Sequence, residues 1–417
     1  MKNSAPALVT LAVLSLPVVA HAAEGNIFLR QRNVLVGERV PKGYETAGIR
    51  LGAFTLSPAV EAGLSYNDNI FYNNARKVSD NIVSLAPSAI LSSGWSRHAL
   101  MASFRSEYQD FTKHSSENTF VWTLAGAGRL DYGAYNNLNF SVDYGQNYQP
   151  RYDPVAPQSV KKPIKFDAFN AQVGTDYIIN RLKLTGLVHY SKFEYADALS
   201  LAGVVLPQNQ RDYNRVSYTG RAEYAFSPNT SAYLLYSGNR QAYDLNGPDR
   251  NSHGHNVAIG ASFDLPDLVT GEVQLGYVKQ LYTSSRFKPS QGSEFNAKVS
   301  YFLTPLTMIV VQTGRDLRES PDPVASGVFT TSSSVEIDHE LLRTLVLTAN
   351  YTRIDDRYNG VDRRYKRDQF LLGAKYLVSP NIYLKATLQS NKLRSSGVNT
   401  NEPYDDQMVK VAITFKD

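Results

Sequence analysis

Residues 216–226 read VSYTGRAEYAF, and every second position from Val216 to Phe226 is apolar, aromatic or small. The positions between them include Ser217, Arg221 and Glu223. Successive side chains of a β-strand point to opposite faces, so this alternation indicates a strand with one face toward an apolar medium and the other toward water. A chain built from such strands must form a sheet that has an apolar medium on one side and water on the other.

The same alternation recurs along most of the chain. Counting three weaker cases at 232–238, 309–313 and 329–337, we find about eighteen such segments, each about as long as a membrane-crossing strand. The clearer segments lie at 60–66, 83–91, 100–104, 120–124, 138–144, 169–177, 182–190, 216–226, 257–263, 273–277, 295–301, 345–351, 370–376, 382–388 and 409–415.

Short and long connections alternate between these segments. Short turns include those at 94–97 and 379–381. The longer polar loops are expected at 67–80, 149–163, 244–252 and 355–366. This arrangement predicts an all-β fold, a transmembrane antiparallel up-and-down β-barrel of about 18 strands (16–18), with short periplasmic turns and longer extracellular loops. A soluble all-β sandwich or propeller is the alternative.

The N-terminus predicts export from the cytoplasm. Lys2, an apolar run from Ala7 to Ala20 and the small-residue site at 20–22 form a secretory signal peptide over residues 1–22. We assign residues 23–50 to a periplasmic N-terminal segment and residues 51–417 to an outer-membrane β-barrel. The segment at 23–50 could be a docking tail, a plug or a disordered leader.

Composition narrows the function classes. The formal net charge of +5 is mild and its charges are interspersed, so no nucleic-acid partner is expected. With no cysteine, disulfides and thiolate metal sites are excluded, while 27 tyrosines and 18 phenylalanines suit interfacial girdles. No catalytic motif is present, and His253 and His255 have no third ligand nearby in the sequence. We therefore expect no enzyme activity, no catalytic residues, no cofactor and no metal.

A barrel of about eighteen strands is too wide for side chains to fill, so an aqueous channel or a plugged lumen is expected. In the alternative interpretation, the charges of the lumen pair across strands and only solvate it. The loops at 149–163, with four prolines, and at 196–207, unusually apolar, could gate or plug the lumen or simply pack. The basic candidates for the lumen wall are Arg105, Arg129, Arg215, Arg221, Lys298, Lys375, Lys385 and Lys410.

The expected partners are those of an outer-membrane barrel: outer-membrane lipids, lipopolysaccharide and the barrel assembly machinery. The last strand ends in an aromatic residue, Phe415, followed by two further residues, and resembles the terminal assembly signal of such barrels. A solvated charged loop is the alternative to lipopolysaccharide binding at 355–366. The candidate contacts to lipopolysaccharide phosphates are Arg357, Arg363, Arg364, Lys366 and Arg367.

Three stretches, at 48–54, 66–71 and 95–98, carry a family resemblance. They read GIRLGAF, YNDNIF and WSRH, and they resemble the opening of the second putative beta-barrel porin family. The resemblance implies an outer-membrane barrel of a Gram-negative bacterium, often linked to capsular or exopolysaccharide secretion with a periplasmic polysaccharide-export protein. It implies a polysaccharide export channel; a general or solute-specific diffusion porin and a closed structural or adhesive barrel are the alternatives.

Overall fold

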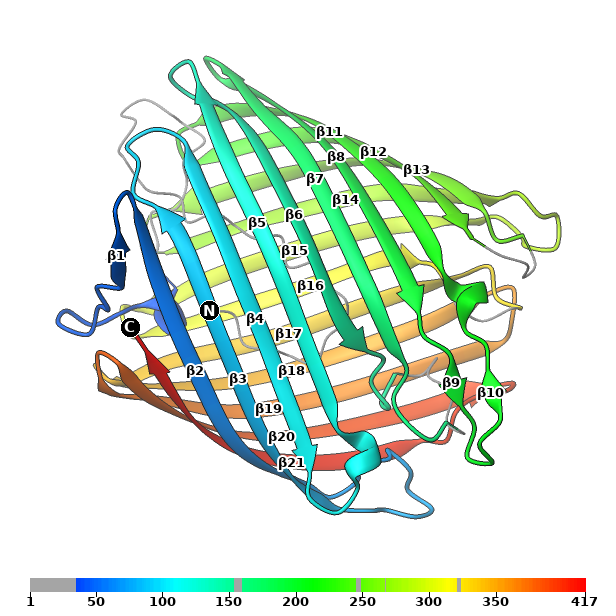
Figure 1. Cartoon of the computed structure of the whole chain (residues 1–417). Coiled ribbons are helices and arrows are strands. Elements are labelled where there is room, and N and C mark those ends of the chain that lie inside the picture. The colour runs from blue at the N-terminus through cyan, green and yellow to red at the C-terminus, as the bar shows by residue number, and fades with distance from the viewer. Residues whose placement is uncertain (1–34, 154–159, 245–248, 267, 321–323) are drawn as a thin grey trace.

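The computed structural model describes residues 35–153, 160–244, 249–266, 268–320 and 324–417. The predicted signal peptide at 1–22 lies outside these residues. The main sheet has 19 strands; β1 (Ile49–Leu51) pairs only with β2, and the other eighteen close into an antiparallel barrel, as predicted (Figure 1). Their bounds are β2 (Phe54–Asn67), β3 (Asp80–Ser93), β4 (Ala99–Phe111), β5 (Thr119–Tyr132), β6 (Asn136–Tyr148), β7 (Lys165–Ile179), β8 (Leu182–Tyr195), β11 (Tyr213–Ser227), β12 (Thr230–Tyr243), β13 (Ser252–Leu265), β14 (Val269–Tyr282), β15 (Ser290–Thr304), β16 (Thr307–Arg318), β17 (Gly327–Leu342), β18 (Leu345–Asn359), β19 (Arg363–Ser379), β20 (Ile382–Gly397) and β21 (Tyr404–Lys416).

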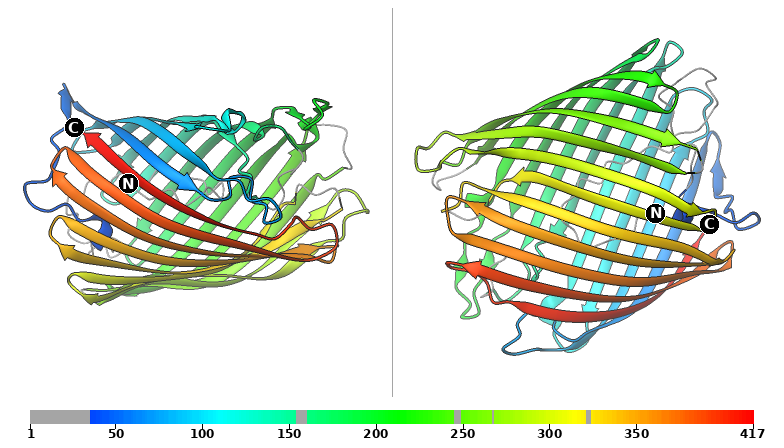
Figure 2. Two further views of the ribbon diagram at one scale, coloured as in Figure 1. Left: turned by 90° about the horizontal axis from the view of Figure 1, so that it is seen from below. Right: turned by 180° about the vertical axis from the view of Figure 1, so that it is seen from behind.

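Each barrel strand pairs with its neighbour in sequence, except at one seam. There β2 pairs with β21, from Ala59 opposite Lys416 to Asn67 opposite Met408. Figure 2 shows this seam, where the blue first strand lies beside the red last strand. Closure leaves no unpaired strand edge in the barrel, which is what a sheet in hydrocarbon requires.

The alternation seen in the sequence divides the barrel wall into two faces. Large apolar side chains, such as Leu64 (66% exposed) and Ile259 (63% exposed), face outward. Exposed tyrosines lie toward both ends of the strands, including Tyr66, Tyr108 and Tyr144 toward the long loops and Tyr132, Tyr177, Tyr301 and Tyr376 toward the short turns. Such aromatic girdles mark the two interfaces of a membrane.

The strands are longer than the sequence pattern predicted. They run from 12 residues in β16 to 17 in β19, whereas about 9–11 residues cross a bilayer. The predicted loop at 355–366 is therefore wrong: β18 continues to Asn359 and β19 starts at Arg363. The polar residues that indicated a loop instead pair across the two strands, with Asp355 opposite Lys366, because the strand continues beyond the membrane into water.

Three short helical turns and one small hairpin complete the fold. The 3-10 helices are η1 (Val36–Glu38), η2 (Ser115–Glu117) and η3 (Asn209–Arg211). The apolar loop predicted at 196–207 contains a hairpin of β9 (Ala198–Leu199) and β10 (Val205–Leu206). Ala198 packs against Val160 and Ile164 of the preceding loop, while the hairpin tip leaves Leu201 73% exposed.

The described part of the N-terminal segment, from residue 35, lies first against the inner wall of the barrel. Val36 in η1 is fully buried against Phe302 and Met308, which face the lumen where β15 ends and β16 begins. Arg39 donates a hydrogen bond to the carbonyl of Pro305 in the adjoining turn. Of the three possibilities for residues 23–50, the described part therefore resembles a partial plug at the end of the lumen that carries the short turns.

Candidate functional site in the barrel lumen

The eight basic residues predicted for the lumen all lie on the inward face. In seven of the eight cases an adjacent residue of the same strand is an exposed apolar residue that faces outward, as Phe104 is beside Arg105 and Val411 beside Lys410. For Lys298 the outward face of β15 is marked by the exposed Tyr301, three residues further along the strand. The alternation of side chains across a strand then directs the basic residue inward. The others are Arg129, Arg215, Arg221, Lys298, Lys375 and Lys385.

The most connected group on the wall surrounds Arg221. Its guanidinium pairs with Glu223 (2.9 Å) and Glu272 (3.2 Å) and lies 3.5 Å from the ring centroid of Tyr233. The Tyr233 hydroxyl donates to Glu272 (2.8 Å). Gly260 makes this arrangement possible, because a Cβ there would lie 2.2 Å from the Tyr233 ring. This part of the wall is charged but internally paired.

The basic residues differ in how far they are neutralised. Arg129 pairs with Asp131 (2.9 Å), whereas Lys385 and Lys410 share the single carboxylate of Glu61 at 3.0 and 3.2 Å. Lys375 has no ion pair within the described part of the chain. The alternative in which charges pair across strands thus holds for Arg221, with Glu272, and for Lys385 and Lys410, which share Glu61. Arg129 pairs within its own strand, β5.

The loop that follows β6 crosses toward distant strands at the extracellular end. Arg151 forms a two-pronged ion pair with Glu117 of η2, at 2.9 and 2.7 Å, and both side chains are at most 9% exposed. The backbone carbonyl of Tyr152 accepts a hydrogen bond from Tyr404 of β21 (3.1 Å). The loop is therefore fixed at one point to η2, beside β5, and at another to β21.

Tyr152 belongs to an aromatic cluster inside the extracellular mouth. Its ring contacts Tyr72 (centroids 5.6 Å apart), and Tyr72 contacts Tyr404 (5.0 Å). Tyr365 and Leu393 complete the buried part of this tyrosine cluster. Burial raises the pKa of the Tyr72 hydroxyl well above its usual range. The hydroxyl group of Tyr72 therefore stays protonated at physiological pH, and the rings pack on one another at the extracellular end.

A second group of contacts joins the described loop residues near the extracellular ends of β13, β15 and β16. Arg250 donates to the carbonyl of Ala325 (3.1 Å) and lies over the ring of Phe287 (5.3 Å). Glu319, just after β16, accepts a hydrogen bond from Ser252 (3.0 Å). Burial raises the pKa of Glu319 to about 7. This carboxyl group therefore changes its charge near neutral pH.

The five residues predicted to bind lipopolysaccharide lie on both faces of the wall. Arg357 and Arg364 lie outside, and both pair with Asp355, while Lys366 lies on the same outer face. Arg363 and Arg367 lie inside: Arg363 is 8% exposed, and Arg367 pairs with Asp356 at 2.7 Å. The inward pair cannot reach lipid phosphates from there, because β19 is already a strand at these residues. The contacts of the outward three stay predictions.

Sequence reasoning missed several residues of the mouth and of the outer rim. On the outer face, Asp368 bridges Arg394 (3.2 Å) and Arg353 (3.8 Å), and strand alternation could have placed all three there. The Arg151–Glu117 pair and the contact of Tyr152 with Tyr404 carried no signal, since the partners lie 34 and 252 residues apart.

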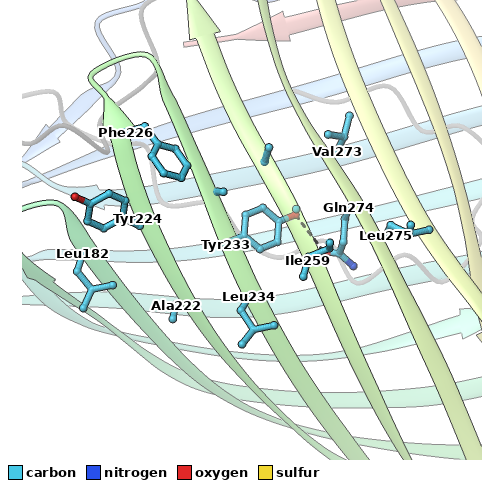
Figure 3. A pocket seen from close by; sticks show the side chains of 13 residues that line it. Leu182, Ala222, Tyr224, Phe226, Tyr233, Leu234, Ile259, Val273, Gln274 and Leu275 are labelled. Carbon is cyan, nitrogen blue, oxygen red and sulfur yellow. Dashed lines mark hydrogen bonds between the residues drawn. The ribbon is translucent and has the colours of Figure 1, made fainter.

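A hollow on the barrel wall is not part of the lumen. It has a volume of about 730 Å³, and Figure 3 shows that it is lined by outward side chains such as Tyr224, Phe226 and Leu275. The floor includes small residues at 222, 232 and 261, all alanine. Because these positions face the membrane, lipid chains would fill the hollow.

Comparisons with known proteins found similar solved structures and one family. Solved structures with a similar fold include OccK2 (OpdF) of Pseudomonas aeruginosa (13% identity, 87% of this chain and 98% of that one, TM-score 0.49). A BenF-like porin from Pseudomonas fluorescens Pf-5 has 12% identity (87% and 99% covered, TM-score 0.46). The siderophore receptor PirA from Pseudomonas aeruginosa has 8% (87% and 80%, TM-score 0.47).

Curated proteins gave no match. The family model described as putative beta-barrel porin 2 matches residues 41–417, which covers the barrel and the end of the N-terminal segment. This match agrees with the resemblance carried by the stretches at 48–54, 66–71 and 95–98. The chain therefore belongs to the putative beta-barrel porin 2 family and is an outer-membrane β-barrel porin.

Proposed function

We propose that the protein is a non-enzymatic channel in the outer membrane of a Gram-negative bacterium, through which a polysaccharide leaves the cell. The observation that carries the proposal is the polar inner wall of an eighteen-strand barrel, a size at which porins keep an aqueous path.

The contacts at the mouth set a condition on this function. Residues 149–153 of the loop after β6 are held by the pair of Arg151 with Glu117 and by the hydrogen bond from Tyr404 to the carbonyl of Tyr152, and we propose that these contacts open when a polymer passes. The N-terminal segment at Val36 lies at the opposite, periplasmic end, where a periplasmic export partner would reach it. We propose that such a partner acts from that side.

The test compares secreted with cell-retained polysaccharide in a deletion strain and in the complemented strain. We expect loss from the medium, retention in the periplasm and restoration by the wild-type gene. Unchanged secretion after deletion would refute the export role.

A channel-blocking variant separates transport through the lumen from an indirect effect. Because the sequence contains no cysteine, Thr387→Cys places a single thiol on the inner wall, beside Lys410 across the β20–β21 pair. Lys392→Cys, on the outer face of the same strand, is the matched control. A bulky maleimide should stop secretion only in the Thr387→Cys strain; equal secretion by the two labelled strains would contradict passage through the lumen.

The second candidate is a solute-specific diffusion porin, and the contacts that hold Arg151 and Tyr152 at the mouth favour it. A loop fixed at the mouth of a barrel selects small solutes by size and charge without opening. Planar-bilayer conductance and liposome swelling with small sugars, together with normal polysaccharide secretion after deletion, would support this candidate. A barrel without any conductance would instead indicate a structural or adhesive role.

A further inference from the structure

A lysine cluster surrounds Tyr383 at the periplasmic end of the lumen. The ring of Tyr383, the second residue of β20, is 6% exposed. Three ammonium groups lie within 6 Å of its centroid: those of Lys385 (5.2 Å), Lys375 (5.7 Å) and Lys416 (5.9 Å). Attraction of cations to the face of a tyrosine ring accounts for part of their placement.

Strand register brings these lysines together at a cost. Lys375 and Lys385 are directly opposite each other across the β19–β20 pair. Like charges at directly opposite positions destabilise a sheet, so stability alone does not favour this arrangement. Lys416 joins them from the end of β21, where Thr414 lies opposite Tyr383. The barrel thus holds three cations together where its own stability favours fewer.

Carboxylates compensate only part of this charge. Glu61 bridges Lys385 and Lys410, at 3.0 and 3.2 Å. Among the described residues, no carboxylate lies within 4.0 Å of the ammonium groups of Lys375 or Lys416. At the extracellular mouth, in contrast, Arg151 is paired with Glu117. Excess positive charge is therefore available to a ligand at the periplasmic end.

We propose that Lys375, Lys385 and Lys416 form an anion-binding site for the carboxylate groups of an acidic polysaccharide, at the entrance used by an exported chain. This inference rests on the proposed export function and adds the class of polymer. Lysine ammonium groups on flexible stems suit the site, because transport needs binding that is weak enough for release. A polymer with one carboxylate per sugar would occupy the cluster repeatedly as it advances.

The experiment measures block of the channel by a charged probe in planar bilayers. Tri-galacturonate is the acidic probe and maltotriose is the neutral probe, each added to either side of the purified full-length protein. The test variant is Lys375→Gln/Lys385→Gln/Lys416→Gln. The control Lys192→Gln/Lys279→Gln/Lys392→Gln removes three lysines from the outer face of the wall.

We expect tri-galacturonate to block the wild-type channel at lower concentration from the periplasmic side than maltotriose does. The test variant should need at least about tenfold more tri-galacturonate for the same block. Removal of one charge-assisted contact weakens binding by about this factor. Its reversal potential in a KCl gradient should also move toward cation selectivity. Equal block of the test and control variants would overturn the site.

A second variant and an independent readout cover the cases in which the triple variant does not fold or the export function fails. If the triple variant does not fold, as judged by heat-modifiable migration on gels, Lys375→Gln alone is measured, with Lys279→Gln as its control. The bilayer readout does not involve secretion. Loss of block together with normal secretion after gene deletion would support the anion site while refuting export, and an export defect with unchanged block would do the reverse.

Discussion

Glu117→Ala tests whether the ion pair of Arg151 with Glu117 holds residues 149–153 of the loop after β6 in place at the mouth. The substitution leaves the Arg151 guanidinium, whose side chain is 9% exposed, without its carboxylate partner. Breaking a buried ion pair by removing one partner costs about 3–5 kcal/mol. Since 1.4 kcal/mol is a tenfold change in an equilibrium, the open form of the loop should gain population by at least about 100-fold.

Single-channel conductance and limited trypsin digestion report this opening directly. We expect a higher and noisier conductance, together with faster cleavage after the exposed Lys161 of the loop; the bond after Lys162 resists trypsin because Pro163 follows it. Cleavage follows the population of the open form when the loop opens and closes rapidly. Glu194→Ala, which removes the partner of Lys192 in an exposed pair (37% and 55%), is the control and should change neither readout.

A double variant separates the ion pair from general damage to the loop. Glu117→Ala/Arg151→Met removes both charges and restores an apolar side chain, a replacement that is often neutral for a buried pair. We expect it to recover most of the wild-type conductance and resistance to trypsin. Wild-type behaviour of Glu117→Ala alone would refute the claim that this pair holds the loop in place.

Three further predictions concern the wall, the rim and the N-terminal segment. Val411→Arg, on the outer face of β21, should destabilise the barrel folded in liposomes by about 2–4 kcal/mol, as measured by denaturant titration. The control Thr387→Arg places the same charge on the lumen face and should change stability less. Equal effects of the two variants would contradict the assigned faces. Burial raises the pKa of Glu319 to about 7, so the folded protein keeps a proton there that the unfolded chain releases above about pH 4.5. The stability of the rim around β16 should therefore fall as pH rises from about 4.5 to 7. Hydrogen exchange around β16 measures this stability, and its pH dependence should be lost in Glu319→Gln. Val36→Asp places a charge in a fully buried apolar site and should release the N-terminal segment, seen as protease sensitivity from the periplasmic side; equal sensitivity of the wild type would argue against the packing on Met308.

The sequence was enough to predict the faces of the barrel wall, because strand alternation is a local property. Arg105 and Lys410 could be assigned to the lumen from their neighbours in sequence alone. Strand alternation did not predict the inward faces of Arg363 and Arg367, because the sequence pattern indicates a loop up to residue 366 and a strand only from residue 370. Polarity was taken to end the strand, whereas a barrel strand continues beyond the membrane as long as its partner does.

Contacts between distant segments could not be predicted in this way. The three lysines around Tyr383 come together through the register of three strands, and a register shift of one residue would turn Lys375 outward. The hold of Arg151 on Glu117 depends on the path of a proline-rich loop, which alternation does not describe. A single sequence therefore predicts which residues face water but not which of them meet.

The seam between β2 and β21 has a consequence for biogenesis. Every other barrel pairing joins consecutive strands and can form as a hairpin or nearby contact, but Ala59 meets Lys416 only when almost the entire chain is available. Until then the growing sheet carries two open edges, each able to pair with a foreign strand. Sealing the cylinder is thus the final and slowest ordering step, since its chain separation is the greatest. The last strand is consequently the natural place for an assembly factor to hold the edge until the first strand arrives.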